Sequence, residues 1–155
     1  MPVSTPSEVL DVLTATPVRL AAVRGLALDR RPSAEEWSAG EVLAHLRSCG
    51  DVWGGCLERV LAEDRPTIRA VNPRTWIGRT DYPQLGWSEH LPAFVAARTA
   101  LLELLHGLAP ADWERSALVV GAGRPVERTV LSYAAWLASH ERPHLRQVER
   151  AAAGS

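Results

Sequence analysis

Residues 37–63 read WSAGEVLAHLRSCGDVWGGCLERVLAE, and this stretch carries the clearest helix signature in the chain. Ser38 followed three residues later by Glu41 is a capping box, in which each side chain accepts a hydrogen bond from the other residue's backbone N–H. We therefore predict a helix from Ser38 to about Glu63. Its apolar residues recur with the period of an amphipathic helix, so one face should be buried. That face consists of Val42, Leu46, Cys49, Trp53, Cys56, Leu57 and Val60.

Three further segments show helical periodicity, and no segment alternates convincingly as a strand. They cover about residues 5–28, residues 88 or 91 to 106, and residues 129–150. Pro17 should kink or restart the first helix, because proline cannot donate the helical hydrogen bond. Residues 64–87 and 107–128 are long connections without periodicity. The pattern predicts an all-α fold, a four-helix bundle in which residues 64–87 form a long crossover loop between the second and third helices.

The composition indicates one domain without a large charge imbalance. The chain has 155 residues, with 17 basic and 18 acidic side chains and a formal net charge of −1. This balance argues against nucleic-acid binding, which needs a basic surface. No apolar run approaches the ~20 residues of a membrane span, and no signal peptide is apparent. We expect a cytoplasmic protein with one domain over residues 5–150 and a disordered tail at residues 151–155.

The spacing of the two cysteines and the lack of lysine limit which covalent bonds and reactions the protein can support. Cys49 and Cys56 are seven residues apart on the predicted helix, or about 10 Å. A disulfide needs Cα atoms within about 7 Å, so both residues should be reduced thiols in the apolar face. All 17 basic residues are arginines. Schiff-base chemistry on a lysine amine is therefore excluded.

Three of the five histidines should point inward. His45 lies at the edge of the apolar face of its helix, and His140 and His144 are four residues apart beside the apolar stripe of the last helix. One inward histidine is usually a hydrogen-bonded core residue, but three that converge from two helices indicate a metal site with open coordination positions. His90 and His106 lie near the ends of the third helix and are predicted to be surface residues.

Residues 140–144, HERPH, also match the H-E-x-x-H pattern in which two histidines bind zinc and the glutamate is a general base. Pro143 argues against that motif, because it should kink the helix between the two ligands. Glu141 could still serve as a catalytic base or support a ligand, or it could lie on a solvated face.

Arg98 interrupts the apolar stripe of the third helix, where an unpaired guanidinium would be expensive to bury. It therefore needs an anion. The simpler partner is an internal carboxylate, and the alternative is an anionic substrate or the carboxylate of a thiol cofactor.

Several motifs in the expected order resemble the DinB/YfiT-like family. Residues 37–46, WSAGEVLAHL, resemble its W-S-x-x-E-V-x-x-H-L signature, and residues 140–147, HERPHLRQ, resemble its closing H-x-x-x-H-L-x-Q. Phe94 with Arg98, and residues 112–115, DWER, resemble its middle segments. Residues 118–128 depart from the family pattern, because the common G-H element is absent there.

The resemblance implies a left-handed up-down-down-up four-helix bundle that forms a homodimer. It also implies a divalent metal held by three histidines, which correspond here to His45, His140 and His144. Zinc is the default ion, and nickel, iron and copper also suit imidazole ligands. Better-understood members of the family resemble transferases and isomerases that use a low-molecular-weight thiol such as mycothiol, bacillithiol or glutathione.

Three functions share this ligand set. The first is a metal-dependent thiol S-transferase or isomerase of the mycothiol type, acting on a small-molecule substrate. The second is a metal-dependent hydrolase in which water is the nucleophile. The third is a dimeric metal-binding module without catalytic turnover. The sequence does not separate them.

Overall fold

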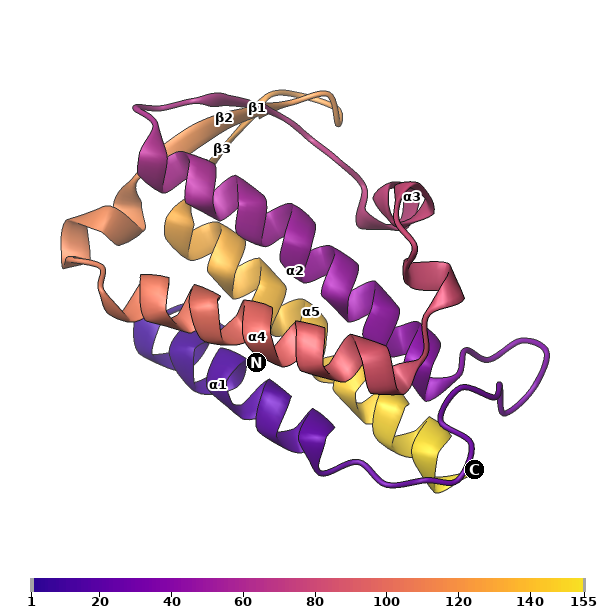
Figure 1. Ribbon diagram of the computed structural model, residues 1–155. Coiled ribbons are helices and arrows are strands. Elements are labelled where there is room, and N and C mark those ends of the chain that lie inside the picture. The colour runs from indigo at the N-terminus through magenta and orange to yellow at the C-terminus, as the bar shows by residue number, and fades with distance from the viewer. Residues whose placement is uncertain (1, 155) are drawn as a thin grey trace.

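The computed structural model describes residues 2–154 and contains four long helices packed side by side. They are α1 (Pro6–Ala21), α2 (Ala39–Ala62), α4 (Trp87–His106) and α5 (Val130–Ala153). Both α1 and α2 pack against α4 and α5. In Figure 1, α2 and α4 run in one direction while α1 and α5 run in the other. The predicted bundle is therefore present, and a long connection brings the chain back along it before α4 begins.

The start of α2 is as predicted. The Ser38 side chain accepts a hydrogen bond from the Glu41 N–H at 3.0 Å, and Glu41 Oε1 accepts one from the Ser38 N–H at 3.1 Å. This capping box satisfies two backbone donors that a helix start would otherwise leave unpaired. It fixes the register of α2 and hence the direction in which His45 points.

The first helix is shorter than predicted. It ends at Ala21, and Pro17 lies inside it without starting a new helix. The missing N–H of Pro17 would leave the carbonyl of Leu13 unpaired, but that carbonyl accepts a hydrogen bond from Arg98 Nη1 at 2.9 Å. The arginine of a neighbouring helix therefore replaces the donor that proline lacks.

The last helix is longer than predicted. Residues 151–153, expected to be a disordered tail, are its final turn, and Ala152 is buried. Ser155 lies outside the described residues. Within residues 2–154, no helix combines the length and apolar character needed to cross a bilayer.

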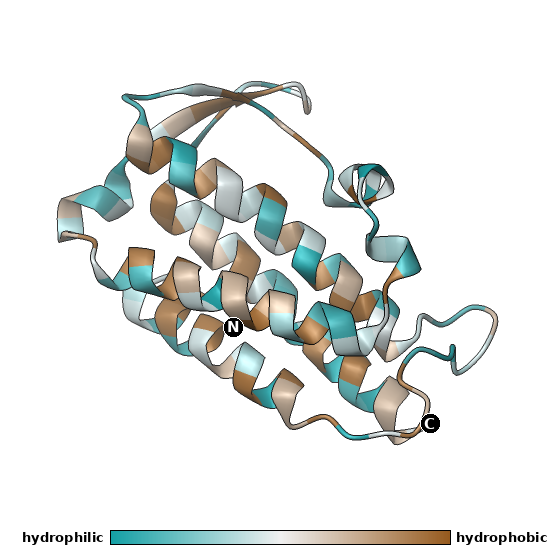
Figure 2. Cartoon of the chain, viewed as in Figure 1, coloured by the Kyte–Doolittle hydropathy of each residue, from teal (hydrophilic) through white to brown (hydrophobic). Residues whose placement is uncertain are grey.

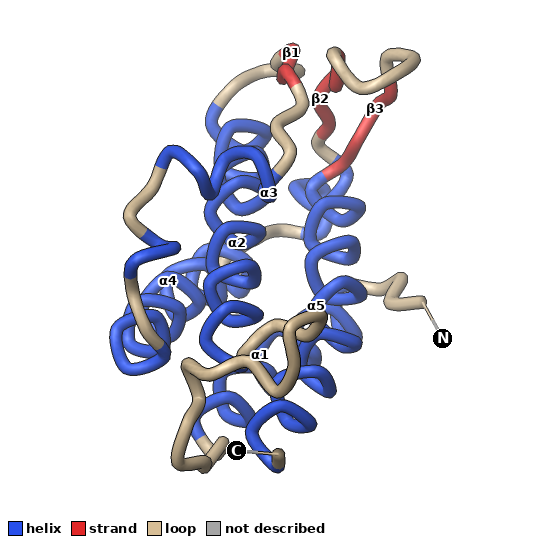
Figure 3. The backbone as a smooth tube through the Cα atoms, turned by 90° about the vertical axis from the view of Figure 1, so that its right-hand side faces the viewer, coloured by secondary structure: helices blue, strands red, loops and turns tan. Residues whose placement is uncertain are grey.

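The expectation of an all-α fold without strands is wrong in one respect. The two long connections form a three-stranded sheet, in which β1 (Thr67–Arg69) pairs parallel with β2 (Ser116–Val120) and β2 pairs antiparallel with β3 (Val126–Thr129). The sheet lies at one end of the bundle, where α2 ends and α5 begins (Figures 1 and 3). Strands of three to five residues leave little periodicity in a sequence, and β1 also depends on a partner about 50 residues away. Short helical turns complete the connections: α3 (Pro73–Trp76), η1 (Ile77–Arg79), η2 (Tyr82–Gln84) and η3 (Pro110–Glu114).

The buried apolar residues form two clusters. Figure 2 shows hydrophobic and hydrophilic residues alternating along the helices that contribute them. One cluster includes Trp53 and Leu137 at the sheet end, and the other includes Leu46 and Val148 towards the opposite end. Where the clusters meet along the helices, each helix contributes a buried polar residue, and α2 contributes two. We call this set the polar layer: Thr16 of α1, His45 and Ser48 of α2, Arg98 of α4 and Glu141 of α5.

Candidate metal centre

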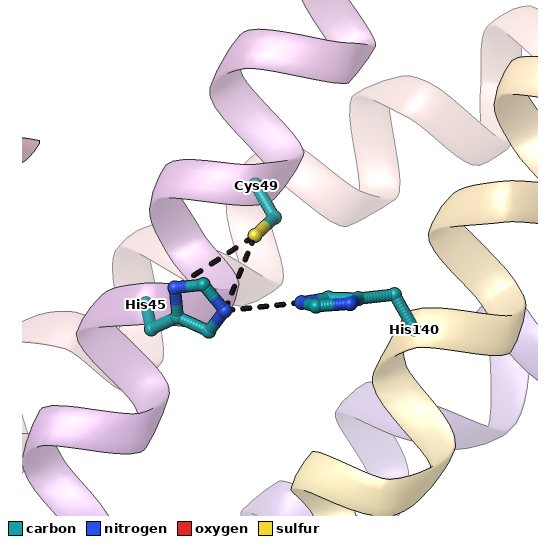
Figure 4. A group of neighbouring side chains, drawn as sticks. All are labelled: His45, Cys49 and His140. Atoms are coloured by element: carbon teal, nitrogen blue, oxygen red, sulfur yellow. Dashed lines mark hydrogen bonds between the residues drawn. The ribbon is translucent and has the colours of Figure 1, made fainter. Parts of the chain in front are cut away.

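The imidazoles of His45 and His140 meet between α2 and α5. Their Nε2 atoms are 3.0 Å apart and the ring planes are inclined by 66° (Figure 4). His45 is 5% exposed, and its ring projects from α2 towards α5. Two ring nitrogens that face each other at this distance suit joint coordination of one ion.

The Cys49 thiol lies beside the same pair. Its Sγ atom is 3.6 Å from Nε2 of His45, and the ligand atoms of His45, Cys49 and His140 all lie within 4.8 Å of one another (Figure 4). The sequence predicts Cys49 only as a reduced thiol in the apolar face of its helix. The available signal was its spacing of four residues from His45, which places both side chains on one face of α2.

His144 is one turn beyond His140, and its ring completes a cluster of three imidazoles. Its centroid is 4.8 Å from that of His45 and 4.6 Å from that of His140. His144 does not belong to the compact set formed with Cys49, but Nδ1 of His144 is 2.9 Å from the Gln147 side-chain oxygen. Such a contact fixes the tautomer and leaves Nε2 free, as is common for histidines that bind metals.

The low pKa values of His45 and His140 suit the binding of a cation. Burial lowers the pKa of His45 to about 4, helped by His144, His140 and Arg74. Burial also lowers the pKa of His140 to about 4, helped by His144 and Arg74. Both rings are therefore neutral at pH 7, and an unprotonated imidazole offers a lone pair to a metal. Burial raises the pKa of the Cys49 thiol to about 12, and the charge of Glu141 adds to this effect.

Tryptophans hold the imidazoles in place. Trp37 packs edge-on against His45 with ring centroids 5.7 Å apart, and Trp53 packs against His140 at 5.2 Å. Trp53 is in turn stacked on Trp136 at 4.5 Å. These contacts restrict the rotation of both rings, so the donor set is organised before an ion binds.

Glu141 and Arg98 bind each other within the polar layer. Arg98 Nη1 donates to Glu141 Oε1 at 3.0 Å, and Arg98 Nη2 donates to Glu141 Oε2. Glu141 is fully buried and Arg98 is 3% exposed. The anion that Arg98 needs is therefore an internal carboxylate, and both oxygens of Glu141 are occupied by the guanidinium.

The prediction that His90 is a surface residue is wrong, whereas His106 is exposed as predicted. The connection before α4 folds over the first turn of that helix and covers His90. Its Nε2 atom is 3.2 Å from the carbonyl oxygen of Tyr82, and its Nδ1 atom is 3.4 Å from Arg47 Nη1. Cys49 and Cys56 both lie on α2 as free cysteines, Cys49 buried and Cys56 half-buried.

A cleft of about 510 Å³ opens beside the imidazoles, and His45 lies in its wall. The other walls come from residues 29–31 after α1, from the first turns of α2, and from residues 74–85 of the connection before α4. A site for a small molecule thus adjoins the candidate metal ligands.

The sequence of residues 11–148 matches the family model for the DinB superfamily. The chain belongs to the DinB superfamily. No curated protein matches the chain. Among solved structures, YfiT from Bacillus subtilis has a similar fold, with a TM-score of 0.77 at 19% sequence identity over 94% of this chain and 85% of that one. YfiT is described as a probable metal-dependent hydrolase with an unusual four-helix bundle topology. At this identity the similarity establishes the shared fold of the DinB protein, and the candidate site rests on its own geometry.

Proposed function

We propose that this DinB-superfamily protein is a metal-dependent enzyme in which His45, His140 and His144 hold a divalent ion beside the cleft. The observation that supports this function is the meeting of neutral imidazoles from α2 and α5 next to a cavity large enough for a small substrate. A divalent ion supplies Lewis acidity and lowers the pKa of a water or thiol that binds to it. The histidines fix the position of the ion, and the neighbouring tryptophans restrict how water approaches it.

Of the possible reactions, we favour transfer or isomerisation that uses a small thiol of the mycothiol type. Glu141 is bound by Arg98. Of the two carboxylates that line the cleft, Glu41 is bound by Arg31 at 2.9 and 2.7 Å, and Asp29 accepts the Trp87 N–H at 2.8 Å. Hydrolysis usually requires a side-chain base to take a proton from water. A thiol is much more acidic than water, so it would release its proton to solvent on binding the ion and would need no such base. Its sulfur would then bond to an electrophilic carbon as the leaving group departs.

Hydrolysis is the second candidate, and the observation that favours it is the shared fold with YfiT. A binding module without turnover would use the same ligands. The homodimer implied by the family resemblance also belongs to this proposal, and sedimentation equilibrium tests it.

Metal analysis of the purified protein tests the site. Zinc is the expected ion, with nickel or iron as alternatives. We expect His45→Ala, His140→Ala and His144→Ala each to lose bound metal, whereas the control His106→Ala keeps it because His106 is exposed and remote from the cluster. Full metal content in all three variants would contradict the ligand assignment.

Thermal unfolding of the metal-loaded protein with mycothiol, bacillithiol or glutathione tests the thiol. A ligand at 100 times its dissociation constant should stabilise the protein by about 2.7 kcal/mol. No stabilisation by any of the three would favour the hydrolase.

A further inference from the structure

Two arginines line the cleft, and only one of them is neutralised. Arg31 forms an ion pair with Glu41 in which the closer nitrogen–oxygen distance is 2.7 Å. Arg74 forms no ion pair with any carboxylate in residues 2–154. An arginine without a carboxylate partner beside a substrate cavity is available to bind an anionic ligand.

The structure positions Arg74 close to the metal ligands. Arg74 belongs to α3, which packs on α2, and the Asn72 side chain caps this short helix by accepting the Arg74 N–H at 2.9 Å. The guanidinium lies 5.1 Å from the centroid of the Trp37 ring, and the same ring packs against His45. The cation and the first metal ligand therefore share one aromatic neighbour.

The charge of Arg74 also acts on the candidate ligands. It contributes to the lowered pKa of both His45 and His140, as expected for a cation that faces the cluster. The remaining carboxylate of the cleft, Asp29, is held at the start of α4, where its Oδ1 accepts the Trp87 N–H at 2.8 Å. A divalent ion among neutral imidazoles would add two positive charges beside Arg74, so the loaded cleft favours an anion.

We propose that Arg74 binds the carboxylate of the molecule that enters the cleft, so that the substrate or thiol cofactor of this enzyme is anionic. This inference rests on the proposed function, because it places the reacting sulfur at the ion and a carboxylate at Arg74. With glutathione or bacillithiol the thiol itself can supply that carboxylate, whereas with mycothiol, which has none, the second substrate supplies it. It also moves to Arg74 the anion-binding role that the sequence suggested for Arg98. The planar guanidinium can pair with both oxygens of a carboxylate, which gives orientation as well as affinity.

The experiment uses the Co²⁺-loaded protein and two thiols of similar size, 3-mercaptopropionate and the neutral 2-mercaptoethanol. Binding of sulfur to the ion is followed by the sulfur-to-cobalt absorption band. We expect Arg74→Gln to weaken 3-mercaptopropionate roughly 10-fold and to leave 2-mercaptoethanol unchanged, with Arg74→Lys in between. The matched control is Arg79→Gln, which removes the same charge from an exposed residue of the same connection that does not line the cleft.

A carboxylate could belong to the thiol or to a second substrate, and a further titration separates these sources. Propionate is added to protein that already carries 2-mercaptoethanol. If propionate binds to the wild type and Arg74→Gln abolishes this binding, Arg74 binds the second substrate. If Arg74→Gln weakens only the binding of 3-mercaptopropionate, Arg74 binds the carboxylate of the thiol.

Two results would overturn different claims. If the protein takes up no Co²⁺, or neither thiol produces the absorption band, the proposed function fails and this inference fails with it. If both thiols bind but Arg74→Gln changes the affinity for neither 3-mercaptopropionate nor propionate, the anionic ligand is rejected and the thiol chemistry stands.

Discussion

At the scale of single residues, Arg98 has two partners that together explain its burial. Its guanidinium binds both oxygens of Glu141 and also the Leu13 carbonyl that Pro17 leaves without a helical donor. One side chain from α4 thus joins α1 and α5 through the polar layer. A buried ion pair satisfied in this way is costly to break from one side, because the remaining charge stays buried without a partner.

We therefore expect Glu141→Gln to lower the free energy of unfolding by about 3 kcal/mol while metal content stays unchanged. Chemical denaturation and metal analysis measure the two quantities. The matched control is Glu149→Gln on the same helix, whose carboxylate pairs with Arg19 at the surface and should contribute less than about 1 kcal/mol. A Glu141→Gln protein of wild-type stability that has lost turnover would show instead that Glu141 acts as a base.

Cys49, whose thiol lies beside the three imidazoles, gives a second test of the ligand set. The contact of His144 Nδ1 with the Gln147 side-chain oxygen would leave Nε2 of His144 free for a metal, whereas Cys49 is a fully buried thiol with a raised pKa. In Co²⁺ titrations we expect Cys49→Ala to bind with nearly wild-type affinity and His144→Ala to bind at least roughly 10-fold more weakly. If wild-type protein shows a sulfur-to-cobalt band without added thiol and Cys49→Ala lacks it, Cys49 belongs to the ligand set.

At the scale of elements, the sequence predicts the helices well where local signals define them. The capping box at Ser38 and the glycine after His106 mark ends that the structure reproduces. The meeting of His45 and His140 could also be anticipated, because helical spacing alone places them beside apolar stripes. The contacts that the two long connections make could not be anticipated in this way. Strand β1 forms only through pairing with β2 across about 50 residues, and His90 is buried only because Tyr82 folds back over it.

Tyr82 attaches the connection before α4 to α2. Its hydroxyl donates to Asp51 Oδ2 at 2.5 Å, and the Arg47 guanidinium lies 3.8 Å from the centroid of its ring. The same connection carries Arg74 and one wall of the cleft. Loss of this attachment should therefore loosen the cleft before it unfolds the bundle.

We expect Tyr82→Phe to weaken the attachment by about 1 kcal/mol, which corresponds to roughly 5-fold faster tryptic cleavage after Arg74 and Arg79. Timed digestion with mass spectrometry measures the rate. Thr99→Ala is the control, because the Thr99 hydroxyl bonds only within its own helix and the variant should be cut at the wild-type rate. Equal rates for Tyr82→Phe and wild type would mean that other contacts hold the connection.

At the scale of the whole molecule, three helices each carry an uncharged imidazole that is buried or half-buried. The pKa is lowered to about 4 for His45 and His140 and is also lowered for His90, with burial as the largest cause in each case and Arg47 as the next cause for His90. A histidine whose pKa is depressed by folding favours the native state in its neutral form. Its contribution is complete above the unfolded value of 6.5 and is lost as the pH falls from there towards the folded value.

The metal-free protein should consequently lose roughly 2–3 kcal/mol of unfolding free energy between pH 7.5 and pH 5, or about 5–10 °C in melting temperature. His90→Phe should flatten part of this slope, because burial and the charge of Arg47 lower the pKa of His90 despite the opposing effects of the Tyr82 carbonyl, Asp29 and Glu89. Saturating Zn²⁺ should raise the melting temperature most at pH 7.5 and least at pH 5, because protons compete with the ion for His45 and His140. Calorimetry over this range, with and without chelator, measures both effects. Zn²⁺ stabilisation that does not change with pH would place the ion away from these imidazoles.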